Sequence, residues 1–105
     1  MDRNNVLIIL KNYKNQFADK YGIKSLGLFG SVARDDIKED SDVDICIILN
    51  NPDLITLSRI RQELEEEIKV HVDLIQYRER MNNYLKERIS REAIYVWRPF
   101  FKGNS

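Results

Sequence analysis

Two short motifs in the first half of the chain combine residue types that bind phosphates and metal ions. Gly30 and Ser31 form a glycine–serine pair, and after ten intervening residues Asp42 and Asp44 flank a single valine. Glycine lets the backbone approach a ligand closely, and a serine hydroxyl can donate a hydrogen bond to a phosphate oxygen. Carboxylates two residues apart on a strand share one face and repel each other unless a cation binds both. Mg²⁺ is typically held by one or two carboxylates together with substrate phosphates.

A third carboxylate extends this pattern. Asp73 lies in "HVDLIQY", which reads as another strand. If this strand neighbours the one that carries Asp42 and Asp44, all three carboxylates could form a metal site of the kind that two-metal phosphoryl transfer uses. The stretch "VARDD" after Ser31 predicts a short helix whose first N–H groups face the same point, where they could hold a phosphate. The combined pattern indicates a turn that can hold a triphosphate beside a strand that holds its metal ions.

The same residues also allow simpler interpretations. Asp42 alone could be an exposed residue at the start of a strand, and "KEDSD" could be a solvated acidic loop. The joint spacing of the glycine, serine and aspartates argues against coincidence. His71 is interpreted as a strand-edge residue rather than a ligand, and Cys46 as a residue that packs beside the site.

Helices and strands that could position these residues are readable from hydrophobic periodicity. A helix is expected at roughly 3–20, ended by Gly22, and a second one carries Leu57, Ile60, Leu64 and Ile68, with Asn51 as its cap and Pro52 in its first turn. Three strands are expected, with the sequences "KSLGLFG", "DVDICIIL" and "HVDLIQY". A third helix is marked by Met81, Tyr84, Leu85 and Ile89. The segment "AIYVW" is either a helix end or a short strand. The expected fold class is α/β (α+β), a small mixed sheet with helices packed on one side, forming a single domain over residues 1–105.

Composition limits the classes of function. Seventeen lysine and arginine residues balance 17 aspartate and glutamate residues, so the basic excess of a nucleic-acid-binding surface is missing and no direct nucleic acid binding is expected. Cys46 is the single cysteine, which excludes an intrachain disulfide and favours a reducing compartment. No apolar run reaches membrane-spanning length, and "MDRNNVLIIL" is too short for a signal peptide core. We expect a cytoplasmic protein without a membrane partner.

The Gly30-Ser31 pair, followed after ten residues by Asp42-Val43-Asp44, resembles the signature of the DNA polymerase beta nucleotidyltransferase superfamily. The short length and the segments "FGSVAR", "SDVDICIIL" and "VDLI" resemble its minimal nucleotidyltransferases (MNT), the antitoxin partners of HEPN-domain toxins. The resemblance covers nearly the whole chain. One departure is Asp35, because many relatives have glycine after the Ala-Arg pair, and this aspartate adds a negative charge near the expected phosphates.

The resemblance implies transfer of a nucleoside monophosphate from a triphosphate, usually ATP, to an acceptor hydroxyl. By this resemblance, Gly30 and Ser31 hold the phosphates, and Asp42 and Asp44 bind both metal ions. Asp73 binds the catalytic metal ion and helps to deprotonate the acceptor.

Arg34 is a further candidate of the resemblance. It would neutralise phosphate charge, although a surface ion pair with Asp36 or Glu39 is an equally good interpretation of this arginine.

The resemblance also implies an acceptor, which in minimal nucleotidyltransferase antitoxins is a tyrosine on the HEPN toxin, an RNase. The chain has no length left for a domain that binds a large acceptor, so either the acceptor is small or a partner protein brings it. The aromatic run "YVWRPFF" would suit a partner surface, although packing on its own domain explains it equally well. A catalytically weak module that neutralises a partner by binding is the alternative function. Modification of a small molecule is disfavoured by the length.

Overall fold

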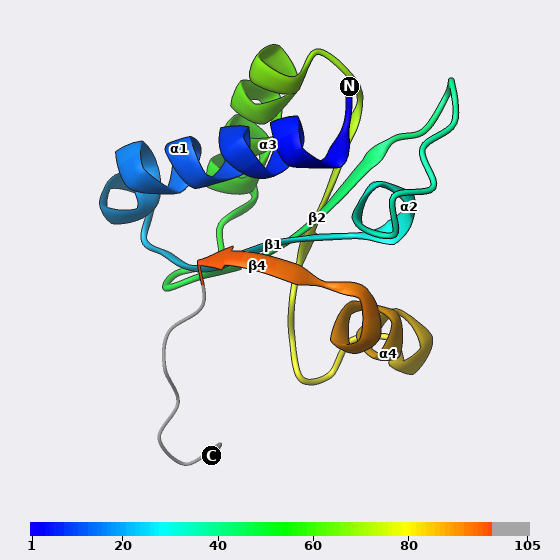
Figure 1. Cartoon of the computed structure of the whole chain (residues 1–105). Helices are drawn as coiled ribbons and strands as arrows, with labels where there is room; N and C mark the ends of the chain where they lie inside the picture. Colours follow the sequence, from blue (N-terminus) through cyan, green and yellow to red (C-terminus); the bar gives the residue numbers. More distant parts are fainter. Residues whose placement is uncertain (98–105) are drawn as a thin grey trace.

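The computed structural model describes residues 1–97, which form a four-stranded mixed sheet with helices on its faces (Figure 1). The elements in chain order are α1 (Arg3–Tyr21), β1 (Ile23–Phe29), α2 (Gly30–Ala33), β2 (Val43–Leu49), α3 (Leu54–Ile68), β3 (Val72–Gln76), α4 (Asn83–Glu92) and β4 (Ile94–Trp97). The strand order is β3-β2-β1-β4, with β2 and β3 parallel and the other pairs antiparallel. The expected fold class is confirmed.

The main core lies between the sheet and the two long helices α1 and α3. Helix α1 begins at Asp2, whose side chain accepts the Asn5 N–H, and it ends at Gly22 with φ 66°, a left-handed conformation that glycine adopts without steric cost. Alternate residues of β2, the apolar side chains of Val43, Ile45 and Ile47, point into this core. They meet a buried helical stripe made of Val6, Leu10, Tyr13, Ile60, Leu64 and Ile68.

Helix α4 departs from the expectation that helices pack on one side of the sheet. It lies against the opposite face from α1 and α3 (Figure 1). Its residue Ile89 is fully buried there against a second, smaller cluster that contains Phe29 and Cys46. The reason is the alternation of β1 and β2, which carries apolar side chains to both faces at these positions, so one layer of helices cannot bury them all.

Several element boundaries differ from the sequence expectation. Helix α3 is capped by Asp53, which accepts the N–H groups of Ile55 and Thr56, so Asn51 is not the cap and Pro52 precedes the helix. An aspartate two residues later competes for the same role, and its carboxylate makes the stronger charge-assisted bonds. The short helix α2 begins at Gly30 rather than after Ser31.

The ambiguous segment near residue 95 is strand β4, paired with β1. Trp97 donates from its indole nitrogen to the carbonyl of Ile23 at 3.2 Å, and the Lys14 ammonium lies over its ring. Trp97 therefore contacts its own domain while remaining 37% exposed, and Tyr95 packs against the cluster that contains Phe29 and Cys46. Phe100 and Phe101 of the expected partner surface lie outside the described residues. None of the helices over residues 1–97 combines the length and apolar character needed to cross a bilayer.

A Lys69→Gly substitution is expected to raise the free energy of unfolding by about 1 kcal/mol, because Lys69 ends α3 in the left-handed conformation that penalises any side chain. Its φ is 68°. Urea unfolding measures the effect. Gln62→Gly, at an exposed position inside the same helix, should instead lower stability by about 1 kcal/mol. Equal effects of the two glycines would contradict this reading of the cap.

Candidate active site

Strand pairing brings two of the expected site carboxylates side by side. Strand β2 pairs with β3 in parallel, and the register places Asp44 opposite Asp73. Neighbouring strands lie about 5 Å apart, and residues in register point to the same face. This is the face opposite to α1 and α3, because the adjacent residues Val43 and Val72 are the ones that enter the main core. The sequence-level condition that the two strands be neighbours is fulfilled.

Asp42 lies just before β2 rather than within it, and it is exposed. Its carboxylate is 3.6 Å from Nδ1 of His71, the residue that precedes β3. His71 lies at the start of the strand, as expected. Its contact with Asp42 was not expected from the sequence. Within residues 1–97 no three His, Cys, Asp or Glu side chains converge as a ready metal cluster. Asp42 thus shares a corner of the sheet with the two other aspartates, while its side chain is turned to the histidine.

Asp44 is the least exposed of the three carboxylates. Burial raises the pKa of Asp44, and the negative charges of Asp73 and Asp42 add to the rise. The nearby guanidinium of Arg88 opposes it. A carboxylate held among like charges and partly removed from water gains from a cation that binds its oxygens. The donor set of carboxylates on adjacent strands therefore fits a hard divalent ion such as Mg²⁺.

The turn after β1 approaches these carboxylates so closely that only glycine fits. Gly30 has φ 78°, in the left-handed region, and a Cβ atom at this position would overlap Oδ2 of Asp44. The backbone of the turn and the carboxylate thus lie in direct contact. Ser31, the next residue, is half-buried, and its carbonyl accepts the Asp36 N–H at 2.8 Å. The structure thus brings Gly30 of the glycine–serine pair against Asp44, and Ser31 follows in the same turn.

Asp35, at the position where the resemblance leads one to expect glycine, adopts φ 62° at the end of this turn. Aspartate and asparagine tolerate the left-handed conformation better than other residues with a side chain. The aspartate at this position therefore keeps the left-handed backbone conformation that a glycine would adopt. Helix α2 is also tied to α1, because Arg3 donates to the carbonyl of Ala33 at 3.1 Å.

Sequence analysis missed two charged residues of the site, and both lie on α4. Glu92 accepts a hydrogen bond from the Gly30 N–H at 3.1 Å and forms an ion pair with Arg34, also at 3.1 Å. Arg88, one helical turn before Glu92, lies 3.6 Å from the same carboxylate oxygen and packs over the Phe29 ring. The ion-pair partner of Arg34 is therefore Glu92, which is neither of the two acidic residues considered from the sequence.

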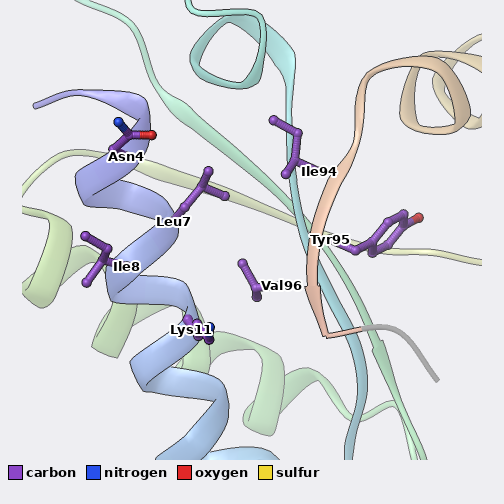
Figure 2. Close-up of a pocket in the computed structure, with 7 residues that line it drawn as sticks. All are labelled: Asn4, Leu7, Ile8, Lys11, Ile94, Tyr95 and Val96. Atoms are coloured by element: carbon purple, nitrogen blue, oxygen red, sulfur yellow. The ribbon is translucent and has the colours of Figure 1, made fainter.

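A groove lies away from the carboxylates, between α1 and the edge strand β4 (Figure 2). Its volume is about 550 Å³. Leu7, Ile94 and Val96 point into it, whereas Tyr95 points to the other face of the strand. Lys11 and Asn4 are its polar lining residues. With neither carboxylates nor a glycine turn in its lining, this groove is distinct from the candidate active site.

The fold and the site together define the class of this protein. The nucleotidyltransferase domain family matches residues 10–96, a span that contains β1 with its turn, the three aspartates and α4. The chain belongs to this family. The resemblance drawn from the Gly-Ser and Asp-x-Asp motifs is thereby confirmed.

One relative and two solved structures show how similar this chain is to individual proteins. The Methanocaldococcus jannaschii protein named "Putative protein adenylyltransferase MJ0126" is 36% identical over 89 residues, which cover 84% of this chain and 91% of the relative. The solved structure of a "putative minimal nucleotidyltransferase" is 30% identical, with a TM-score of 0.72 over 90% of this chain and 95% of that one. An MNT antitoxin in complex with a tri-AMPylated HEPN toxin of Shewanella oneidensis is 19% identical, with a TM-score of 0.66 over 90% and 73% of the two chains, and it shows the shared fold.

Proposed function

We propose that this protein transfers AMP from ATP to a tyrosine hydroxyl of a HEPN-type toxin and acts as the antitoxin of that partner. The observation that carries the proposal is the contact between the Gly30 turn and Asp44, with Asp73 in register on the next strand. A phosphate-binding turn and paired carboxylates at one point are what nucleotidyl transfer needs.

The roles of the residues follow from their places. The backbone of Gly30 and the hydroxyl of Ser31 hold the triphosphate at the turn. Asp42, Asp44 and Asp73 would hold two Mg²⁺ ions, which supply positive charge to the phosphates and to the attacking oxygen. Asp42 reaches this position by turning its side chain away from His71, a small movement for an exposed residue.

The transfer step is a substitution at the α-phosphorus of ATP. The tyrosine oxygen forms a new bond to phosphorus, the bond to the pyrophosphate oxygen breaks, and pyrophosphate leaves. Asp73 is exposed and borders Asp44, so an incoming acceptor can reach its carboxylate. It orients the hydroxyl and accepts its proton, while Arg34 compensates charge on the leaving phosphates.

Two comparisons support the acceptor and the partner. The curated relative described above carries the name of a protein adenylyltransferase. The Shewanella oneidensis complex pairs an MNT antitoxin with a HEPN toxin that bears three AMP groups.

A protein that neutralises its toxin by binding alone is the competing function. The structure offers one argument against it. Asp44 and Asp73 repel each other on adjacent strands, and burial adds to the cost of ionised Asp44. A module that only covers its partner gains nothing from this arrangement, whereas a nucleotidyltransferase uses it to bind cations.

The deciding experiment combines this protein, MgATP and a HEPN toxin encoded beside it. We expect the toxin to gain one or more units of the mass of AMP less one water, located on tyrosine by peptide mass spectrometry. Loss of the toxin's RNase activity should follow the same time course. Full neutralisation without any mass gain would reject catalysis and favour the binding module.

A further inference from the structure

One oxygen atom at the candidate site is surrounded by three donors, two from the turn after β1 and one from α4. The Oε1 atom of Glu92 lies 3.1 Å from the Gly30 nitrogen, 3.1 Å from a guanidinium nitrogen of Arg34 and 3.6 Å from one of Arg88. The Glu92 side chain is only 10% exposed. A backbone N–H with two guanidinium groups is the donor set that proteins use to bind phosphate oxygens.

These donors belong to the place where the triphosphate is expected. Gly30 is the turn residue in contact with Asp44, so an anion bound to its N–H lies beside the carboxylates that would hold the metal ions. Glu92 and a phosphate oxygen cannot use the same donors at once, because both are anionic and would meet at hydrogen-bond distance.

We propose that Glu92 is a latch that occupies a three-donor phosphate subsite formed by Gly30, Arg34 and Arg88, and that a polyphosphate binds there by displacing it. The identity of the polyphosphate as the triphosphate of a nucleotide rests on the proposed function. The subsite itself rests on the three contacts.

Displacement requires little movement. Glu92 is the last residue of α4, and its side chain has three rotatable bonds, so the carboxylate can swing away while the helix stays in place. The Arg34 side chain is 45% exposed and can follow the ligand. Arg88 keeps its position over the Phe29 ring and remains as a fixed cation at the base of the subsite.

Binding of inorganic tripolyphosphate without metal tests the latch, since it needs neither a nucleoside nor catalysis. We expect Glu92→Gln to bind tripolyphosphate about tenfold more tightly than the wild type, because a neutral acceptor holds the three donors less strongly than a carboxylate. Glu92→Asp keeps the charge but is one methylene shorter, so it should also bind more tightly. Calorimetry gives the affinities, and thermal unfolding confirms that each variant is folded.

Glu87→Gln is the matched control. It removes the same charge from the same helix, where Glu87 is exposed and pairs with Arg91 at 3.2 Å, and it should bind tripolyphosphate like the wild type. In the wild type, the amide resonance of Gly30 should shift as tripolyphosphate replaces the carboxylate.

Three outcomes would overturn the latch. Unchanged or weaker binding by Glu92→Gln would mean that Glu92 only supports the turn. Tighter binding by Glu92→Gln but not by Glu92→Asp would indicate general charge repulsion. No binding by any variant would remove the subsite. If Glu92→Gln binds tripolyphosphate more tightly but the wild type transfers no AMP to the toxin, the latch stands and the proposed function is rejected. The two failures can therefore be told apart.

Discussion

A Gly30→Ala protein is expected to bind MgATP about a hundredfold more weakly than the wild type, a loss of about 2.7 kcal/mol of binding free energy. Two physical causes act together. The left-handed backbone at φ 78° penalises any side chain, and the added Cβ overlaps Oδ2 of Asp44. Either the turn or the carboxylate must move, so the phosphates and their metal ions can no longer be held at one point.

Gly22→Ala is the control for this experiment. Gly22 also has a left-handed backbone, at φ 66°, but its added Cβ would meet Asn50 at the far end of β1, where contact is tight rather than overlapping. Both variants should lose stability in urea unfolding, and only Gly30→Ala should lose affinity in calorimetry with MgATP. Equal affinity of Gly30→Ala and the wild type would mean that the turn is not the phosphate site.

The contact between Gly30 and Asp44 also shows how far sequence reasoning reached. The motif and its spacing predict that the glycine turn and the Asp-x-Asp strand serve one site, and the structure brings Gly30 against Asp44. Strand alternation predicts that Asp42 and Asp44 share a face and that Asp73 can join them if the strands are neighbours; the register confirms the pairing of Asp44 with Asp73, whereas Asp42 lies before the strand. The sequence does not determine the pairing itself, since the order of strands in a sheet depends on which side chains pack together across the whole domain.

Glu92 and Arg88 show where sequence reasoning failed. They stand four residues apart in "RISRE", a spacing that ordinary ion pairs on exposed helices also have. Only the packing of α4 on the second face of the sheet, through Ile89, brings them to the Gly30 turn. The burial of Ile89 against Phe29 is a long-range contact, and no local pattern distinguishes a helix that covers the second face from one that joins α1 and α3.

Electrostatic cost gives Asp44→Asn an expected signature of its own. Burial and like charges raise the pKa of Asp44, so the ionised carboxylate destabilises the folded protein at neutral pH. Asp44→Asn should therefore be more stable than the wild type at pH 7. The difference should shrink as the pH falls through the raised pKa, because the wild-type carboxyl then becomes neutral as well.

Asp73→Asn is expected to lower AMP transfer to the toxin by about a thousandfold, within the range that loss of a positioned proton acceptor and charge partner produces. Binding of MgATP should change much less, because in the proposed site Asp42 and Asp44 would still hold the nucleotide's metal ion and the Gly30 turn is intact. Single-turnover assays followed by intact-protein mass spectrometry measure the transfer rate, and calorimetry measures the affinity.

Asp40→Asn controls for the loss of a negative charge, since Asp40 is an exposed residue of the acidic loop before β2. It should transfer AMP at the wild-type rate. The split between affinity and rate is decisive for Asp73, because a residue that only stabilises the fold would lower both together. If Asp73→Asn lost affinity and rate in parallel, or transferred AMP like Asp40→Asn, then Asp73 would not face the acceptor, and the proton of the tyrosine would have to leave by another group.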